Sequence, residues 1–462
     1  MKLTSKPAFI SLSRKSHNGL PMNINGILLL YHLPLSQDAP TILENVNAFK
    51  AHSQFKVWNV NTHLGFPKSL ANARFSTVAL HYSLFGNWPF SLTSEFLNYL
   101  AQSQSSYKVA FFQDEYQYCR ERFDFLNRYR IDCIYTLLEP RYFKAVYQDH
   151  TCVAKIIHHL TGYVSDELIE LARRLTLPDE KRSIDFGYRG RPLPLYLGRG
   201  AQEKTEIAIR FRERAAHLGL RLDIETSEQS RIYGDDWYRF IARCRAFLGV
   251  EAGVSIFDLD GTVREAVDRL LAQNPDTDFA EISEKLQASE DRIYYRTISP
   301  RHFEAAAFRV CQVLFEGDYT GILKPMVHYI ALKKDFSNFD ECLRLFQDKA
   351  FRDQLTENAY RDLIASGKYS YQEFMRGFDR ELLNAGLEPE VAAVDAARFT
   401  RRLDRDRRYL EFRARKNSLM YHKDFPGRRA LSLIGGPPLR MMRKLKQALA
   451  TEKSPSYLKE RN

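Results

Sequence analysis

Short apolar runs recur along the first 170 residues of the chain, and segments with helical periodicity separate them. The runs lack strict alternation of apolar and polar residues, which is typical of strands buried on both faces of a parallel sheet. Helical segments such as Leu92–Gln104 and Tyr116–Arg128 lie between them, so the pattern predicts a layered α/β domain. The expected strands are Gly26–Tyr31, Lys56–Val60, Ser76–His81, Tyr107–Phe112, Ile131–Leu137 and Ala154–Ile157.

A second series of the same kind follows the polar stretch Pro178–Ser183. We therefore predict an α/β fold of two Rossmann-like domains facing across a cleft, residues 1–175 and 176–400, with a basic, partly helical tail, residues 401–462. Ligands of such sheets bind in the crevice at the carboxyl ends of the strands. The expected strands are Ile184–Tyr188, Leu222–Thr226, Ala246–Val250, Ile293–Ile298, Val310–Phe315 and Tyr329–Leu332, and helices include Lys204–Leu218, Asp235–Arg243, His302–Val310 and segments within Phe339–Glu388.

Charge is distributed unevenly along the chain. The 462 residues include 68 Lys+Arg and 57 Asp+Glu, a formal net charge of +11. Residues 401–462 hold 18 basic and 6 acidic residues, or +12, so residues 1–400 carry 11 − 12 = −1. A nucleic-acid-binding body is disfavoured, because such binding needs the basic excess on the docking face.

Cysteine spacing and apolar run length restrict the class of protein further. No C-x-x-C motif or close cysteine pair occurs, which argues against a disulfide framework and a zinc site. No apolar run has the length of a signal peptide core or a membrane span. We expect a cytoplasmic protein without a metal. The six cysteines are Cys119, Cys133, Cys152, Cys244, Cys311 and Cys342.

The most conspicuous short motif is Phe257-Asp258-Leu259-Asp260-Gly261-Thr262. It matches the haloacid-dehalogenase phosphatase signature, in which the first Asp is the nucleophile and the second is the acid. It is also similar to the metal-binding DxD motif found in one class of glycosyltransferases. The alternative is a turn in which both Asp side chains accept backbone N–H bonds and Gly261 closes the loop.

Two segments of the second domain have the composition of an anion site. Gly187-Tyr-Arg189-Gly-Arg191 follows a strand, and Lys204 lies in the helix after it. Ser299-Pro-Arg301 opens an Ala-rich helix whose free N–H groups can bind phosphate, with Glu304 one turn further on. The alternatives are a tight turn with solvated basic side chains and a Glu that only favours the helix dipole.

In the first domain, polar residues follow two of the expected strands. His81 ends one strand, and Asp114 and Glu115 follow another. Strand ends supply cleft residues, so these three are the candidates for a catalytic base or an acceptor ligand. A structural histidine and a helix cap are the alternatives.

Three segments together resemble the donor-binding half of GT-B glycosyltransferases, closest to the family-4 and CgeB-like set of bacterial surface-polysaccharide loci. They are Ile298-Ser-Pro-Arg-His-Phe-Glu304, Val313-Leu-Phe-Glu316-Gly-Asp-Tyr-Thr-Gly321 and His328-Tyr-Ile-Ala-Leu-Lys-Lys-Asp-Phe-Ser-Asn338. The resemblance covers roughly residues 183–375. One departure is Arg296, because the family often has a second Glu eight positions before the Glu at 304.

The resemblance implies a nucleotide-sugar donor in the second domain and an acceptor in the first, with no cofactor or metal. It implies that Glu304 binds the ribose and that the diphosphate meets Arg189, Lys204 and the start of the Arg301 helix. Donor-sugar contacts are expected from Glu316, Tyr319 or the backbone up to Gly321.

The predicted function is transfer of a sugar from a nucleoside diphosphate sugar to a hydroxyl group in cell-surface polysaccharide or glycan synthesis. The alternatives are a non-catalytic nucleotide-sugar-binding protein of the same fold and a phosphatase that uses Asp258. The basic tail includes the amphipathic segment Leu439–Ala450, which indicates peripheral attachment to the inner, anionic membrane face, where the acceptor would be lipid-linked. A solvated tail is the alternative, and no nucleic-acid partner is expected.

Overall fold

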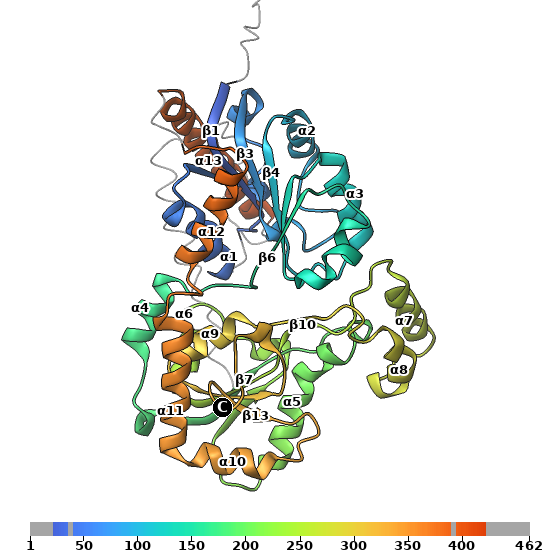
Figure 1. Ribbon diagram of the computed structural model, residues 1–462, viewed down its shortest axis with the longest axis vertical. Coiled ribbons are helices and arrows are strands. Elements are labelled where there is room, and N and C mark those ends of the chain that lie inside the picture. Colours follow the sequence, from blue (N-terminus) through green and yellow to red (C-terminus); the bar gives the residue numbers. More distant parts are fainter. Residues whose placement is uncertain (1–21, 36–39, 390–393, 422–462) are drawn as a thin grey trace, which may run out of the picture.

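The computed structural model describes residues 22–35, 40–389 and 394–421, and it contains two parallel sheets that lie one above the other in Figure 1. The first sheet has the order β2-β1-β3-β4-β5-β6, and every neighbouring pair is parallel. All six strands expected in this domain form. Their bounds are Met22–Tyr31 (β1), Val57–Asn61 (β2), Ala73–Leu80 (β3), Tyr107–Phe111 (β4), Cys133–Thr136 (β5) and Lys155–His158 (β6).

The second sheet has the order β13-β12-β9-β7-β8, again with parallel neighbours. Five of the six strands expected here form this sheet, so the predicted α/β fold with two Rossmann-like sheets is confirmed. Their bounds are Ile184–Arg189 (β7), Leu222–Glu225 (β8), Cys244–Gly249 (β9), Cys311–Phe315 (β12) and Ile330–Leu332 (β13).

The sixth expected strand lies outside the second sheet. Tyr295–Thr297 (β11) pairs antiparallel with Ala252–Val254 (β10). Between them lies an insertion with two helices, Thr262–Gln273 (α7) and Phe279–Leu286 (α8), which the hydrophobic pattern did not predict. This insertion has a small core of its own, made of Ile256, Val267, Ile282 and Leu286.

Helices cover both faces of each sheet. In β1, Ile27 and Leu29 face one apolar core, while Leu28 and Leu30 face another, as the two-residue period of a strand requires. The remaining helices are Pro40–His52 (α1), Ser94–Gln102 (α2), Cys119–Tyr129 (α3), Asp166–Leu175 (α4), Arg199–Ala215 (α5), Asp235–Arg243 (α6), Pro300–Ala307 (α9), Phe339–Gln347 (α10), Lys349–Ala359 (α11), Tyr371–Asn384 (α12) and Val394–Tyr421 (α13).

The packing divides the chain differently from the expected ranges, because the last two helices return to the first domain. Phe378 of α12 packs edge to face on Phe49 of α1 at 5.3 Å between ring centroids. In α13, the Thr400 hydroxyl accepts a hydrogen bond of 2.9 Å from the Trp58 indole of β2. The apolar faces of α12 and α13 complete the two cores of the first sheet. The described residues of α12 and α13 therefore pack with the first domain.

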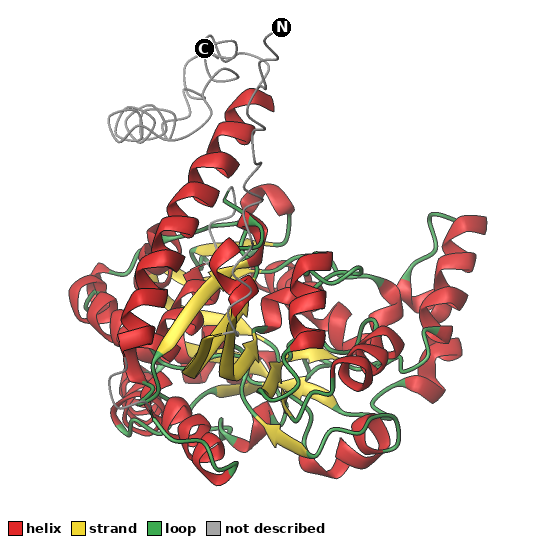
Figure 2. Cartoon of the chain, turned by 90° about the horizontal axis from the view of Figure 1, so that it is seen from above, coloured by secondary structure: helices red, strands yellow, loops and turns green. Residues whose placement is uncertain are grey.

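The predicted basic tail is in part an ordered helix. Figure 2 shows α13 as a long helix whose C-terminal end extends beyond the domain. Its buried residues Phe399, Leu403, Leu410 and Phe412 face the protein. The predicted amphipathic segment Leu439–Ala450 lies outside the described residues. Within the described part of the chain, no helix combines the length and the apolar character that crossing a membrane requires.

The two domains share a core on the side of the insertion. Val254, Phe257 and Tyr295 pack with side chains of the first domain. The Tyr295 hydroxyl reaches the Glu115 carboxylate of the first domain at 3.2 Å. This shared core holds the base of the insertion against the first domain.

Candidate functional site: a cavity between the two sheets

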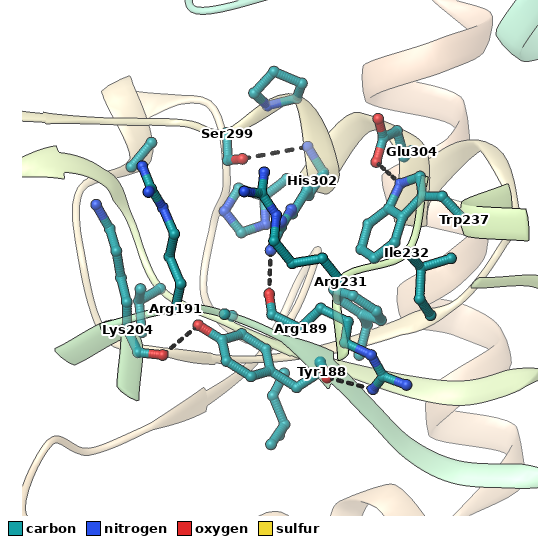
Figure 3. A pocket seen from close by; sticks show the side chains of 18 of the residues that line it. Tyr188, Arg189, Arg191, Lys204, Arg231, Ile232, Trp237, Ser299, His302 and Glu304 are labelled. Atoms are coloured by element: carbon teal, nitrogen blue, oxygen red, sulfur yellow. Dashed lines mark hydrogen bonds between the residues drawn. The ribbon is translucent and has the colours of Figure 1, made fainter. Parts of the chain in front are cut away.

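A cavity of about 480 Å³ opens between the two domains. Its second-domain wall is formed by the carboxyl ends of β7 and β9, the segment before α6 and the first turn of α9, which is where parallel sheets place their ligands. Thr41, Asp114 and Tyr116 line it from the first domain. Figure 3 shows Lys204 and Arg191 on one side of this cavity and Trp237 and Glu304 on the other.

The first turn of α9 has the build of an anion site. Ser299 is the N-cap, and its hydroxyl accepts a bond from the Arg301 N–H at 3.4 Å. Pro300 follows at the first helical position, where a missing N–H costs nothing. The Arg301 guanidinium stacks on the Trp237 ring at 4.9 Å and donates to the Arg189 carbonyl. The predicted helix start is thus confirmed, although α9 begins two residues earlier than expected.

Lys204 brings a second cation to the cavity. Its ammonium donates to the Gly253 carbonyl at 2.6 Å. Burial lowers its pKa to about 8, Asp114 across the cleft opposes that shift, and the nearby Arg191 and Arg301 reinforce it. Three cations therefore converge at the cavity with only partial compensation, and a bound anion would stabilise them. Arg191 lies in the Gly187–Arg191 segment noted in the sequence, but it was not predicted as a site residue.

Glu304 lies in the cavity, as predicted. It is 7% exposed, and its carboxylate accepts a bond of 2.8 Å from the Trp237 indole N–H. Burial raises the pKa of this carboxyl, while the Trp237 bond and the Arg301 charge favour the ionised form. Trp237 was not predicted as a site residue, and its place at the start of an amphipathic helix gave no signal for that role.

Arg189 does not offer its guanidinium to a ligand, contrary to expectation. That group forms an ion pair with Asp223 of β8 at 2.6 Å and also donates to the carbonyls of Tyr188, Asp223 and Ser230. It packs over the Phe240 ring at 4.4 Å. An acidic residue on the neighbouring strand binds this side chain, so Arg189 ties β7 to β8, while its carbonyl accepts the bond from Arg301.

The expected donor-sugar residues Glu316, Tyr319 and Gly321 are not among the residues that line the cavity. Glu316 and Gly321 are exposed, and Tyr319 is fully buried with its hydroxyl donating to the Phe315 carbonyl at 2.6 Å. Their loop folds instead around Glu251, which does line the cavity. Glu251 was not predicted as a site residue.

Two of the three predicted catalytic residues are structural. His81 is fully buried, and its ring nitrogens face the Ser83 hydroxyl at 2.8 Å and the Asn45 amide oxygen at 3.1 Å. Burial lowers the pKa of His81 to about 3, so it stays neutral and fixes the turn after β3.

Glu115 is also fully buried and away from the cavity. Its carboxylate accepts bonds from the Thr136 hydroxyl at 2.7 Å, the Leu137 N–H at 2.8 Å and the hydroxyls of Tyr147 and Tyr295. Burial raises the pKa of Glu115, and these hydrogen bonds oppose that shift. Of the three candidates, only Asp114 faces the cavity.

The Asp-Leu-Asp-Gly-Thr motif forms the turn that opens α7. Asp258 accepts from the Arg264 N–H at 2.9 Å, and Asp260 accepts from the Thr262 N–H at 3.1 Å and hydroxyl at 2.6 Å. Gly261 has φ +80°, a left-handed conformation that glycine adopts readily. The turn interpretation is therefore confirmed. Across the described residues, no group of three or more His, Cys, Asp or Glu side chains is placed to hold a metal.

Arg296 stands where the resembled family often has a carboxylate, and it is held outside the cavity lining. Its guanidinium pairs with Glu203 at 3.1 Å and Asp291 at 3.0 Å and is almost fully buried. The charge is therefore neutralised within the domain and does not enter the site.

Comparison with known proteins finds structural similarity at low sequence identity. No family model matches the chain, and no curated protein matches its sequence. A glycosyltransferase from Rickettsia africae ESF-5 matches with 10% identity and a TM-score of 0.39, over 79% of this chain and 99% of that chain. An alpha-glucosyltransferase in complex with UDP-glucose and DNA containing an abasic site matches with 10% identity and a TM-score of 0.44, over the same shares.

An alpha,alpha-trehalose-phosphate synthase (UDP-forming) from Burkholderia vietnamiensis matches with 9% identity and a TM-score of 0.42, over 79% of this chain and 100% of that chain. At TM-scores between 0.39 and 0.44, these likenesses identify neither the reaction nor the substrate of this chain.

Proposed function

We propose that this protein is a glycosyltransferase that transfers a sugar from a nucleoside diphosphate sugar to a hydroxyl group. The observation that carries the proposal is the arrangement of Lys204, Arg191 and Arg301 beside Glu304 in one interdomain cavity. The cations suit a diphosphate, and the carboxylate suits the two hydroxyls of a ribose. The sequence resemblance of residues 183–375 to the donor half of GT-B enzymes points the same way.

In the proposed reaction, the bond between the sugar and the diphosphate breaks, the acceptor oxygen bonds to the sugar, and the acceptor hydroxyl releases its proton. Negative charge builds up on the leaving diphosphate, so cations and the N–H groups of α9 are needed there in the transition state. Lys204, Arg191 and Arg301 supply that charge without a metal. Asp114 is the proposed group that faces the acceptor, since it is the carboxylate among the described first-domain residues that line the cavity.

Binding of the donor is the first test. Differential scanning fluorimetry with millimolar UDP, GDP, ADP, CMP and their sugar conjugates should raise the melting temperature for one nucleotide family. The Glu304→Ala variant should lose this shift, and the exposed Glu316→Gln variant should keep it. No shift with any nucleotide would refute the donor site.

Turnover is the second test. Release of the nucleoside diphosphate and transfer of labelled sugar should both be measured with a panel of hydroxyl acceptors. Binding without hydrolysis or transfer under any condition would favour the non-catalytic nucleotide-sugar-binding protein instead.

We further propose that the protein works at an anionic membrane surface, with a lipid-linked acceptor of cell-surface glycan synthesis. The support is the outer side of α13, where Arg401, Arg402, Arg405 and Arg408 are exposed. Binding to vesicles of phosphatidylcholine with 30% phosphatidylglycerol should exceed binding to pure phosphatidylcholine vesicles. Replacing these four arginines by glutamine should weaken the binding while nucleotide affinity is unchanged. Equal binding of the variant would contradict this placement.

A further inference from the structure

The polar groups of the cavity follow an order from one end to the other. Glu304 and Trp237 occupy one end, and Arg301 lies next to them because it stacks on Trp237 at 4.9 Å. Lys204 lies at the far end, where its ammonium is bonded to the Gly253 carbonyl at 2.6 Å. Figure 3 shows this separation of Lys204 from Glu304. Glu251 is two residues before Gly253 and also lines the cavity, so a second acidic residue belongs to the Lys204 end of the lining.

Glu251 is held in place by neutral donors. It is 6% exposed, and its carboxylate accepts bonds from the Tyr319 N–H at 2.9 Å, the Asp318 N–H at 3.1 Å and the Tyr294 hydroxyl at 3.0 Å. Two of these donors are backbone N–H groups, so the carboxylate has a defined orientation. It is thus an oriented acceptor at the edge of the cavity.

The negative charge of Glu251 is not consumed by an ion pair. Arg296 and Lys334 are the nearest cations that act on its pKa, and both are bonded to Glu203, at 3.1 Å and 2.9 Å. In the described part of the chain, no lysine or arginine lies within ion-pair distance of Glu251. Burial raises the pKa of this carboxyl, and the bonds from the Tyr319 N–H and the Tyr294 hydroxyl oppose that shift.

The loop that holds Glu251 is built closely against it. A Cβ on Gly317 would lie 2.7 Å from the Glu251 Cδ and Oε2 atoms, so any larger residue there would displace the carboxylate. The loop 316–321, expected to contact the donor directly, is not part of the cavity lining. It positions Glu251 instead.

A nucleoside diphosphate sugar has the matching order of groups: a ribose diol, a diphosphate and then a sugar with several hydroxyls. An ionised carboxylate only accepts hydrogen bonds, and sugar hydroxyls donate them. We propose that Glu251 binds hydroxyl groups of the donor sugar and determines which sugar is accepted. This inference rests on the proposed function, because it names the ligand group at the far end of the same cavity.

The test separates the sugar from the nucleotide. Isothermal titration calorimetry should compare the free diphosphate and the hexose conjugate of the nucleotide that wild-type protein binds. In Glu251→Gln, affinity for the conjugate should fall roughly 10- to 100-fold, the range for loss of a hydrogen bond to a charged group. Affinity for the free diphosphate should change less than threefold. Equal losses for both ligands, or no loss for either, would overturn the inference.

Two controls distinguish binding from support of the loop. Tyr294→Phe removes one donor to Glu251 but keeps the carboxylate, so it should lower thermal stability without a selective loss of the conjugate. Glu316→Gln removes an exposed carboxylate of the same loop and should change neither affinity. If Tyr294→Phe reproduces the selective loss, Glu251 acts through the loop and the inference is wrong.

A donor that lacks one hydroxyl gives an independent measurement. For one deoxyhexose conjugate, wild type should lose affinity and Glu251→Gln should lose no more, since the two changes remove the same bond. Additive losses for every deoxy position would contradict the contact. If wild type binds no nucleotide at all, the proposed function fails first, and the inference falls with it.

Discussion

The two walls of the cavity differ in how much chemistry they hold. The second domain supplies the cations Lys204, Arg191 and Arg301 and the carboxylates Glu304 and Glu251, whereas the first supplies Thr41, Asp114 and Tyr116. Both walls lie at carboxyl ends of parallel strands, so fold position alone does not account for the difference. The strand ends of the first domain hold polar residues too, but His81 and Glu115 are used internally. A strand-end position is thus not sufficient to make a polar residue part of the site.

The strongest test of this contrast is removal of Glu304, the carboxylate proposed to bind the ribose. Glu304→Ala should weaken nucleotide binding by about 1.5–3 kcal/mol, or roughly 10- to 100-fold, because a charge-assisted interaction is lost in a buried site. Asp114→Ala on the opposite wall should change nucleotide affinity less than threefold and lower kcat instead. Titration calorimetry and steady-state rates measure the two effects. Equal effects on affinity would show that both walls bind the nucleotide.

Replacing Arg191 should affect binding, whereas replacing Arg189 should affect stability. Arg191→Ala should weaken diphosphate binding roughly tenfold at unchanged stability, since its side chain lines the cavity. Arg189→Ala should leave an unpaired Asp223 and lower the free energy of unfolding by about 1–3 kcal/mol. Chemical denaturation and calorimetry check both. The reverse pattern would restore Arg189 as the diphosphate ligand.

The low pKa of Lys204 predicts a pH dependence of donor binding. Its pKa is lowered to about 8, and only the protonated form attracts a diphosphate. Affinity should therefore be highest below pH 8 and fall severalfold as the pH rises above it. Lys204→Arg should abolish the fall, because arginine stays protonated. A pH profile shared by wild type and variant would assign the titration to another group.

The smallest effect is expected at the conspicuous Asp motif. Asp258→Asn should leave nucleotide binding and transfer unchanged and lower stability by no more than about 1 kcal/mol, since the residue only caps the turn at α7. Release of phosphate from any phosphoester that depends on Mg²⁺ and on Asp258 would contradict this and revive the phosphatase interpretation.

The hydrophobic periodicity of the sequence was sufficient to predict the strands of the two sheets. It was not sufficient to predict which polar side chains point into the cavity. The strands and the start of α9 are local features, because buried runs and an N-cap Ser before Pro are written in adjacent residues. The roles of Arg189, His81 and Glu115 depended on partners far along the chain, namely Asp223, Asn45 and Tyr295. Trp237 and Glu251 were missed for the same reason, since each becomes a site residue only through a neighbour from another element.

The return of α12 and α13 to the first sheet has a consequence for synthesis of the chain. The second domain is formed largely from one continuous stretch, whereas the first needs segments from both ends of the protein. While the ribosome is still making residues 371–421, the apolar face that receives Phe378 is uncovered. The second domain can therefore fold during translation, and the first is completed only near its end.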